Sequence, residues 1–233
     1  MNKKRILYRL TCFLILCGFF CFPSWASAPK KGVYSNNVKA TKKVALTFDD
    51  GPHPRYTQQI LDILDQYQIK ATFFMIGVNV ERYPETFQKI LKSGCEIGNH
   101  TYSHHNIDTM SENNLADELT ACEESIQRVG GNKPTLFRPP RGMLNQEATS
   151  AIVDRGYSVV LWSIDTQDWK HTPPETIYRE VIHSLKDGDI ILMHDYVSGT
   201  NTTCQALKLL IPEILKRGYE FVTISQLIKE DTA

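Results

Sequence analysis

"LTFDDGPHP", residues 46–54, places two adjacent aspartates, Asp49 and Asp50, at the end of an apolar run and directly before a Gly-Pro pair. Neighbouring side chains of a strand point to opposite faces, and adjacent carboxylates repel each other. Such a pair needs partners from elsewhere in the chain. The rest of the sequence indicates where these partners lie.

The run before this pair is the first of seven short β-rich segments that alternate with helical patterns. Strands are predicted at residues 43–48, 71–77, 95–100, 135–140, 158–165, 189–195 and 220–224. Helices are predicted at residues 56–67, 81–92, 111–129, 145–154, 174–185 and 203–216. This alternation is typical of parallel βα units, and both an open doubly wound sheet and a barrel satisfy it.

Polar residues at the ends of the predicted strands distinguish the two architectures. The residues at or just past a carboxyl end are Asp49, Asp50, His100, Arg138, Asp165, Asp168 and His194. In a (β/α) barrel these ends converge on one mouth, where active sites are built. An open sheet draws its site from two or three neighbouring strands. The sequence therefore predicts an α/β fold with a single barrel domain.

The amino-terminal residues have the layout of a secretory signal peptide. Basic residues at positions 3–5 precede a mostly apolar, uncharged stretch at 10–22, and WASA follows at 25–28. The alternative is an uncleaved membrane anchor, but a spanning helix needs roughly 18 to 20 apolar residues. We expect a signal peptide over 1–28, a short linker over 29–41 and one domain over 42–230. The protein would then be secreted or cell-wall associated, with membrane contact only through the signal peptide.

The charge balance argues against a nucleic-acid partner. The chain has 26 basic and 26 acidic residues; four of the basic ones and none of the acidic ones lie in 1–28, so the cleaved chain carries a net charge of −4. That balance does not suggest a nucleic-acid partner, which would require a basic face. Three of the six cysteines also lie in 1–28. The others, Cys95, Cys122 and Cys204, have no metal-knuckle spacing, and we expect buried thiols.

Two histidines four residues apart, His100 and His104, provide partners for the aspartates. This spacing places two imidazoles on one side of a helical turn, which suits one metal ion. Two neutral histidines and one carboxylate are a common catalytic zinc set. One aspartate would then be a ligand and the other would take a proton from water. Ordinary alternatives are a pair formed with His105, a simple Asp-Asp-Gly turn, or a magnesium site in a phosphate-handling enzyme.

Five motifs in order make the sequence resemble the polysaccharide deacetylase family, the carbohydrate esterases that share the NodB homology domain. The motifs are TFDDG (47–51), HTYSH (100–104), RPPRG (138–142), DTQDW (165–169) and LMH (192–194). The resemblance extends from residue 42 to about residue 228. It implies a distorted (β/α)7-type barrel in a single domain and metal-dependent removal of acetyl groups from sugars, usually from N-acetylglucosamine.

The resemblance also implies a role for each site residue. The metal ligands would be Asp50, His100 and His104, and the ion would be Zn²⁺, or Co²⁺ or Ni²⁺ as in some family members. Asp49 would be the general base, held and kept ionised by Arg138. His194 would be the general acid, with its tautomer fixed by Asp168. The pocket for the acetyl methyl group would be walled by Trp162 and Leu192.

Two positions depart from the family pattern. Arg141 stands where the third motif usually has an aromatic residue. The oxyanion contact expected there comes from the backbone N–H, so catalysis survives the exchange. Its side chain borders the sugar groove and would favour a carboxylate-bearing glycan such as muramic acid, with a surface salt bridge as the alternative. His105 stands where a proline is expected and is either a spare donor or without a role.

We therefore expect an exported, monomeric, metal-dependent N-deacetylase that acts on N-acetylglucosamine in peptidoglycan or in a chitin-like poly-GlcNAc polymer. One alternative is an O-acetyl esterase acting on xylan, because the motifs do not separate amide from ester. Another is a non-catalytic sugar-binding relative. The intact set of carboxylates, histidines and arginine argues against the latter, and fold analogy alone would not license a choice of substrate.

Overall fold

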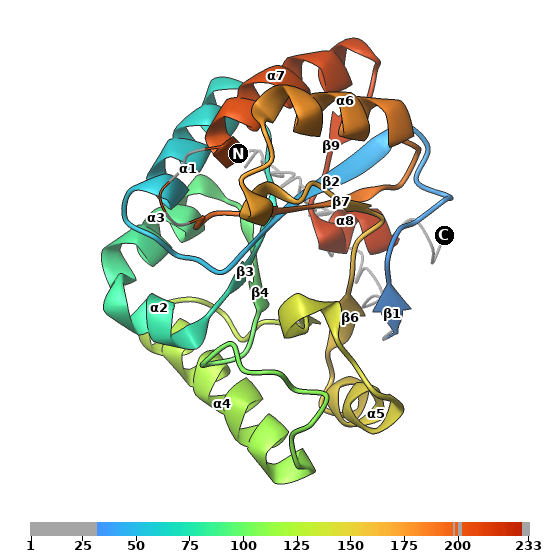
Figure 1. Ribbon diagram of the computed structural model, residues 1–233. Helices are drawn as coiled ribbons and strands as arrows, with labels where there is room; N and C mark the ends of the chain where they lie inside the picture. The colour runs from blue at the N-terminus through green and yellow to red at the C-terminus, as the bar shows by residue number, and fades with distance from the viewer. Residues whose placement is uncertain (1–31, 198, 200–201, 230–233) are drawn as a thin grey trace, which may run out of the picture.

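The computed structural model describes residues 32–197, 199 and 202–229 (Figure 1). The predicted signal peptide lies outside these residues. No helix in the described part of the chain is long and apolar enough to cross a membrane.

Parallel strands form a curled sheet at the centre of the described chain (Figure 1). They are β1 (Val33–Tyr34), β2 (Lys43–Asp49), β3 (Thr72–Met75), β4 (Glu96–Asn99), β5 (Leu136–Phe137), β6 (Ser158–Val160), β7 (Ile164–Asp165), β8 (Ile190–His194) and β9 (Glu220–Phe221). Their order is β1-β6-β5-β4-β3-β2-β8-β7, and β9 pairs with the start of β2. This single-domain curled sheet with surrounding helices is consistent with the predicted distorted (β/α)7 barrel.

Helices surround the sheet in a nearly continuous layer. They are α1 (Tyr56–Gln66), α2 (Gly77–Arg82), α3 (Pro84–Ser93), α4 (Glu112–Arg128), α5 (Gln146–Asp154), α6 (Pro174–Ser184), α7 (Thr202–Lys216) and α8 (Ile224–Lys229). Neighbours in this layer contact one another in the order α6, α7, α1, α3, α2, α4 and α5. Short α8 instead packs with the inner side chains of the sheet at the start of β2.

Alternation along β2 explains how this strand serves both the core and the site. Val44, Leu46 and Phe48 belong to the large apolar cluster that packs the sheet against the helices. Ala45 belongs to the inner cluster with α8. Because side chains alternate, Thr47 and Asp49 follow Ala45 on the inner face. That face therefore changes from apolar to polar toward the carboxyl end of the strand.

The structure adds β1 inside the segment predicted as a linker. Val33–Tyr34 pairs with β6, and the buried side chain of Asn37 donates a hydrogen bond to the carbonyl oxygen of Leu227 at 2.6 Å. A two-residue strand is too short to produce a periodic pattern in the sequence. Residues 32–41 are thus packed on the domain rather than forming a separate tether.

Two predicted elements are divided in the structure. The helix predicted at 81–92 is α2 followed by α3, with Pro84 as the first residue of the second helix, a position that proline favours. The strand predicted at 158–165 is β6 followed by β7. The cysteines follow expectation, since Cys95, Cys122 and Cys204 are buried free thiols.

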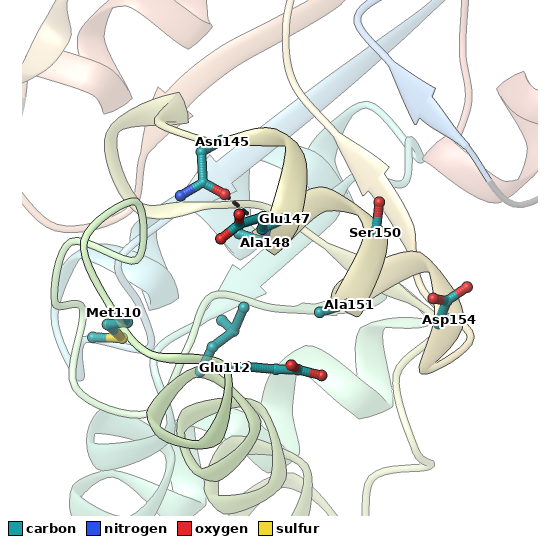
Figure 2. A pocket seen from close by; sticks show the side chains of 9 residues that line it. Met110, Glu112, Asn145, Glu147, Ala148, Ser150, Ala151 and Asp154 are labelled. Carbon is teal, nitrogen blue, oxygen red and sulfur yellow. Dashed lines mark hydrogen bonds between the residues drawn. The ribbon is translucent and has the colours of Figure 1, made fainter.

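A depression of about 270 Å³ lies between α4 and α5, outside the barrel mouth (Figure 2). Its acidic side chains, Glu112, Glu147 and Asp154, are all exposed. Asn145 begins α5 there by accepting a hydrogen bond from the backbone N–H of Ala148 at 2.7 Å, which is an ordinary helix cap.

Candidate active site

A cavity of about 500 Å³ opens where the carboxyl ends of several strands meet. Its lining residues are Asp49, Asp50, His100, His104, Arg141, Trp162, Asp165, Trp169, Leu192 and His194. They come from segments that are far apart in the sequence, and most of them were predicted to share a site. The sequence pattern indicates no role for Asp165 or Trp169, although both lie in the DTQDW motif.

A sharp turn at the end of β2 resolves the conflict between the adjacent aspartates. Asp49 is the last strand residue, and Asp50 leaves the strand with a left-handed backbone, at a φ of 77°. Both carboxylates consequently reach the same imidazole, since His100 Nε2 lies 3.7 Å from Asp49 Oδ2 and 3.5 Å from Asp50 Oδ1. The next residue must be glycine, because a Cβ at Gly51 would collide with the carboxylate of Asp195.

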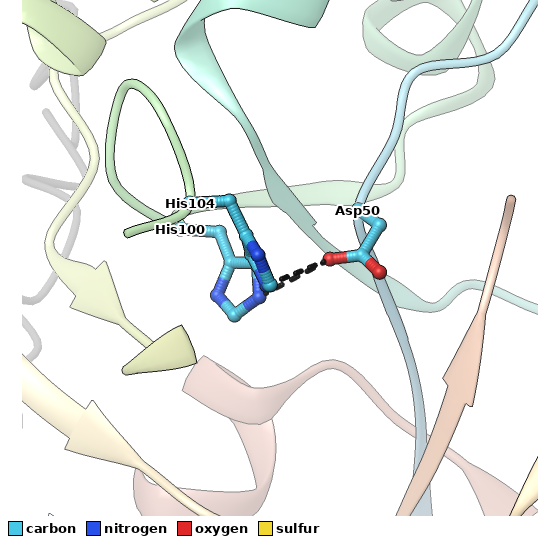
Figure 3. A group of neighbouring side chains, drawn as sticks. All are labelled: Asp50, His100 and His104. Carbon is cyan, nitrogen blue, oxygen red and sulfur yellow. Dashed lines mark ion pairs between the residues drawn. The ribbon is translucent and has the colours of Figure 1, made fainter. Parts of the chain in front are cut away.

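The tautomer of His100 follows from its hydrogen bond to the backbone. Its Nδ1 lies 2.7 Å from the carbonyl oxygen of Arg138, and a carbonyl only accepts, so Nδ1 carries the proton. In the neutral ring, Nε2 then presents a lone pair toward Asp50 Oδ1. His104 Nε2 also faces that oxygen at 3.2 Å (Figure 3).

These three acceptors fit a metal ion. Asp50 Oδ1 is buried and has no hydrogen-bond partner among the described residues, so a cation would satisfy it. The candidate ligand atoms of Asp50, His100 and His104 all lie within 4.8 Å of one another. Ligands about 2.0–2.1 Å from a tetrahedral zinc ion are about 3.3 Å apart, close to the observed separations.

The charges at this cluster agree with the need for a cation. Burial raises the pKa of Asp50, but the neighbouring imidazoles, above all that of His100, outweigh it and lower that pKa to about 2. Burial lowers the pKa of His100, yet the neighbouring carboxylates of Asp49 and Asp50 raise it overall. A positive charge between these groups is therefore favourable. Burial is the main cause that lowers the pKa of His104, which favours its neutral, metal-binding form.

The segment between the two histidines is a loop and not the helical turn that the spacing predicted. Thr101 and His104 both have left-handed backbones, with φ values of 65° and 61°. The hydroxyl oxygen of Thr101 accepts the N–H of His104 at 3.0 Å. The carboxylate of Glu118, on α4, accepts the backbone N–H groups of Tyr102 and Ser103 at 2.9 and 2.8 Å. Hydrogen bonds to the loop thus bring the histidines together.

Arg138 is a fully buried cation that donates hydrogen bonds both to the Asp49 carboxylate and to the backbone. Its Nη1 donates to Asp49 Oδ1 and to the hydroxyl oxygen of Thr47, both at 2.8 Å. Its other nitrogens donate to the carbonyl oxygens of Val160 and Leu161 at 3.1 and 3.0 Å. These two residues lie where β6 ends, so the arginine occupies backbone acceptors at the break between β6 and β7.

His194 lies at the end of β8, and its side chain contacts the buried carboxylate of Asp168. Its Nδ1 donates to Asp168 Oδ1 at 2.8 Å, while Asp168 Oδ2 accepts the backbone N–H of His194 and the hydroxyl of Thr203. Burial lowers the pKa of His194, but the hydrogen bond and charge of Asp168 outweigh it and raise that pKa to about 9. The imidazole is therefore protonated at neutral pH and can donate a proton through Nε2.

The remaining wall combines apolar and cationic side chains. Trp162 and Leu192, which the family resemblance assigns to an acetyl pocket, line the cavity. Arg141 lies in the turn after β5 with a φ of 60°, and its exposed side chain also lines the cavity. No ion pair joins Arg141 to a carboxylate among the described residues.

Comparisons with known proteins agree with the arrangement of these residues. The family model for polysaccharide deacetylase matches residues 36–160. A peptidoglycan-N-acetylglucosamine deacetylase of Bacillus cereus is 42% identical over 194 residues, which cover 81% of this chain and 89% of that protein. The peptidoglycan-N-acetylmuramic acid deacetylase PdaC of Bacillus subtilis is 39% identical over 201 residues, covering 86% of this chain and 41% of that protein.

A solved structure is similar to the whole barrel. The peptidoglycan N-acetylglucosamine deacetylase Bc1960, in complex with 4-naphthalen-1-yl-N-oxidanyl-benzamide, has a TM-score of 0.80 and 34% sequence identity to this chain. The similarity covers 84% of this chain and 92% of that one.

Proposed function

Because this chain belongs to the polysaccharide deacetylase family and is a hydrolase of that family, we propose that it removes the acetyl group from N-acetylglucosamine residues of a cell-wall glycan. The substrate would be peptidoglycan or a poly-GlcNAc polymer, and acetate would be released. The observation that carries this proposal is the convergence of a candidate metal site, a carboxylate and a protonated imidazole on one cavity.

The candidate metal site would be formed by Asp50, His100 and His104. A divalent cation held there supplies Lewis-acid chemistry, which polarises a carbonyl group and lowers the pKa of water. Zinc suits the two imidazoles and one carboxylate, and these three leave a coordination position open for substrate or water. Cobalt and nickel accept similar ligands.

Asp49 is suited to the role of general base. Its Oδ2 faces the metal site while its Oδ1 is held by Arg138, so one oxygen is fixed and the other is directed at the reaction. Water that attacks the acetyl carbon would give its proton to Asp49. The buried guanidinium stabilises the negative charge of this carboxylate before the transfer.

His194 is suited to the role of general acid. Breaking the C–N bond leaves an amine, which departs readily only when it gains a proton. With Nδ1 engaged by Asp168, the Nε2–H group of His194 would donate to the sugar nitrogen. Trp162 and Leu192 would hold the methyl group, so that the carbonyl carbon faces the base on one side and the acid on the other.

The export of the protein is part of the proposal and rests on residues 1–28 alone. The basic start, the apolar stretch and the small residues before position 29 support a cleaved signal peptide. A cell-wall substrate requires the enzyme to be outside the membrane, so the proposed location and the proposed substrate are consistent. The amino-terminal sequence of the protein recovered from culture medium or cell wall would begin at residue 29, and an intact amino terminus would contradict cleavage.

Acetate release from a panel of glycans tests the activity. The zinc-loaded protein is incubated with peptidoglycan, GlcNAc oligomers and acetylated xylan, beside the Asp49→Asn variant. We expect acetate from the GlcNAc glycans and a loss of about 10²–10⁴-fold in the variant, the usual contribution of a general base. Acetate release from xylan alone would contradict the amide substrate and would indicate an O-acetyl esterase. No release from any substrate by metal-loaded protein would favour a sugar-binding protein.

Arg141 supports a second candidate substrate, an N-acetylmuramic acid residue or another carboxylate-bearing sugar. Its exposed guanidinium borders the cavity without an ionic partner among the described residues, and arginine pairs with carboxylates in a bidentate manner. The B. subtilis relative is named for muramic acid. Mass spectrometry of muropeptides after digestion would locate the lost acetyl group. Deacetylation confined to GlcNAc would exclude this candidate.

A further inference from the structure

Four aromatic side chains gather beside the catalytic cavity and have no part in the proposed chemistry. His53, Tyr56 and Tyr196 have ring centroids 4.7–6.2 Å apart, and Tyr83 lies 6.1 Å from His53. His53 follows the aspartate pair in the connection from β2 to α1, and Tyr196 stands two residues after His194. These two connections lie side by side in Figure 1.

Hydrogen bonds tie the two connections together. The hydroxyl of Thr57 donates to Asp195 at 2.6 Å and accepts the backbone N–H of His53 at 2.8 Å. Nδ1 of His53 accepts the N–H groups of Arg55 and Tyr56, both at 3.3 Å, so the neutral ring carries its proton on Nε2. The ring of His53 is thus held by the backbone of its own connection, and the Thr57–Asp195 hydrogen bond joins that connection to the one that carries Tyr196.

Exposure distinguishes Tyr196 from the other rings. It is 42% exposed, whereas His53, Tyr56 and Tyr83 are half-buried. Among the exposed large apolar side chains of the described residues, only Trp169 and Tyr196 are aromatic. Trp169 lines the catalytic cavity. Tyr196 lies two residues after His194, which lines the same cavity and is the candidate general acid. Both exposed aromatic residues therefore lie at the mouth of the barrel.

We propose that Tyr196, supported by His53 and Tyr56, forms a subsite for a neutral sugar ring of the glycan, next to the sugar that is deacetylated. This inference rests on the proposed function. An aromatic face with a polar edge suits the apolar C–H face of a pyranose, while the tyrosine hydroxyl and the Nε2–H of His53 suit its hydroxyl groups. Because Tyr56 and His194 line one small pocket and His194 also lines the catalytic cavity, the occupant would be a further sugar unit of the same glycan.

Substrates of different length test the subsite. For the zinc-loaded protein, the ratio of kcat/KM on GlcNAc hexasaccharide to kcat/KM on the disaccharide is measured in the parent, Tyr196→Ala and Tyr196→Trp. We expect the ratio to fall about tenfold in Tyr196→Ala and to recover in Tyr196→Trp. Leu209→Ala is the matched control, because Leu209 is 40% exposed on α7 and should leave the ratio as it is. An unchanged ratio in Tyr196→Ala would overturn the subsite.

A binding measurement separates this inference from the proposed function. The dissociation constant of the hexasaccharide is determined by calorimetry for Asp49→Asn with and without Tyr196→Ala. Weaker binding by about tenfold supports the subsite even if the parent releases no acetate, in which case only the proposed activity fails. Equal binding, or no binding to either protein, overturns the subsite. If Tyr196→Ala weakened the binding of a peptide-bearing muropeptide but not of the hexasaccharide, the aromatic group would bind the peptide. That result would also overturn the sugar subsite.

Discussion

Two regions of this molecule are lined by carboxylates and differ in what surrounds them. In the depression between α4 and α5, the acidic side chains are exposed and come from two neighbouring helices (Figure 2). In the barrel mouth, Asp50 meets the imidazoles of His100 and His104 (Figure 3). Its neighbour Asp49 meets the guanidinium of Arg138. Water solvates the first set, whereas the second set is stabilised mainly by the protein. Convergence and burial make the difference, because both regions contain acidic groups.

Removal of a candidate metal ligand from the barrel mouth should have the largest effect on activity. We expect His104→Ala to lose bound zinc and to lower kcat/KM by about 10³-fold or more, because Lewis-acid stabilisation contributes several kcal/mol. Metal content after dialysis and acetate release are measured together. The matched control is His105→Ala, since its exposed ring hydrogen-bonds to the hydroxyl of Ser103, whereas the candidate ligands are Asp50, His100 and His104. Zinc lost from the control but kept by His104→Ala would contradict the ligand assignment.

Asp168→Asn should act through the acidity of His194. In the parent, the raised pKa keeps His194 protonated until the pH passes about 9, and activity should fall above that pH. Without the carboxylate, the pKa falls toward its ordinary value of 6.5, so activity at pH 8 should drop about 20-fold more than activity at pH 6. The pH profile of kcat/KM measures this. An alkaline limb at the same pH in both proteins would contradict the role of Asp168.

The same pair makes a prediction for stability, with a defined sign. A histidine whose pKa is raised on folding stabilises the native state fully below pH 6.5, and that contribution is lost as the pH rises through about 9. Urea unfolding should therefore show the largest difference between the parent and Asp168→Asn below pH 6.5. The histidine-linked part of the difference should disappear above pH 9.

A smaller effect is expected from the carboxylate behind the histidine loop. Glu118→Gln exchanges a charged acceptor of two backbone N–H groups for a neutral amide, so the loop that carries His104 should be held less firmly. Outer-sphere substitutions typically cost 10–100-fold in metal affinity, and we expect about tenfold weaker zinc binding by competition with a chelating dye. Glu124→Gln, at an exposed position on the same helix, is the control. Equal affinities in all three proteins would contradict the positioning role.

The smallest effect on activity is expected from a substitution in the depression between α4 and α5. Glu147→Gln removes an exposed charge from the depression between α4 and α5, where water already solvates it. We expect kcat/KM to stay within about twofold and the free energy of unfolding to change by no more than about 0.5 kcal/mol, as is usual for surface substitutions. Acetate release and urea unfolding test both values. A tenfold loss of activity would mean that the depression contributes to the reaction.

Much of the barrel mouth could be predicted because its residues follow strands directly. Asp49 and His194 end β2 and β8, while His100 and Arg138 follow β4 and β5 without a gap. A parallel barrel brings such positions together whatever the loops do. The family resemblance then implied a role for each of these residues, and Arg138 lies at hydrogen-bond distance from Asp49.

Features that depend on loop conformation could not be predicted in the same way. The i, i+4 spacing of His100 and His104 indicated a helical turn, yet left-handed residues and Glu118 build a loop instead. The Glu118 carboxylate is one of many acidic groups on α4, and no pattern singles it out before the fold is known. Likewise, β1 is too short for periodicity, and the stacking of Tyr196 on His53 joins two loops that are distant in sequence.

The most direct measurement is a zinc titration of metal-free protein, followed by acetate release from GlcNAc hexasaccharide. The geometry of Asp50, His100 and His104 predicts that release is absent at first, rises with added zinc and saturates at about one ion per chain. It also predicts that the same titration of His104→Ala stays flat. Acetate release without metal, or zinc bound at this site with no release from the hexasaccharide, would contradict the proposed metal-dependent deacetylase.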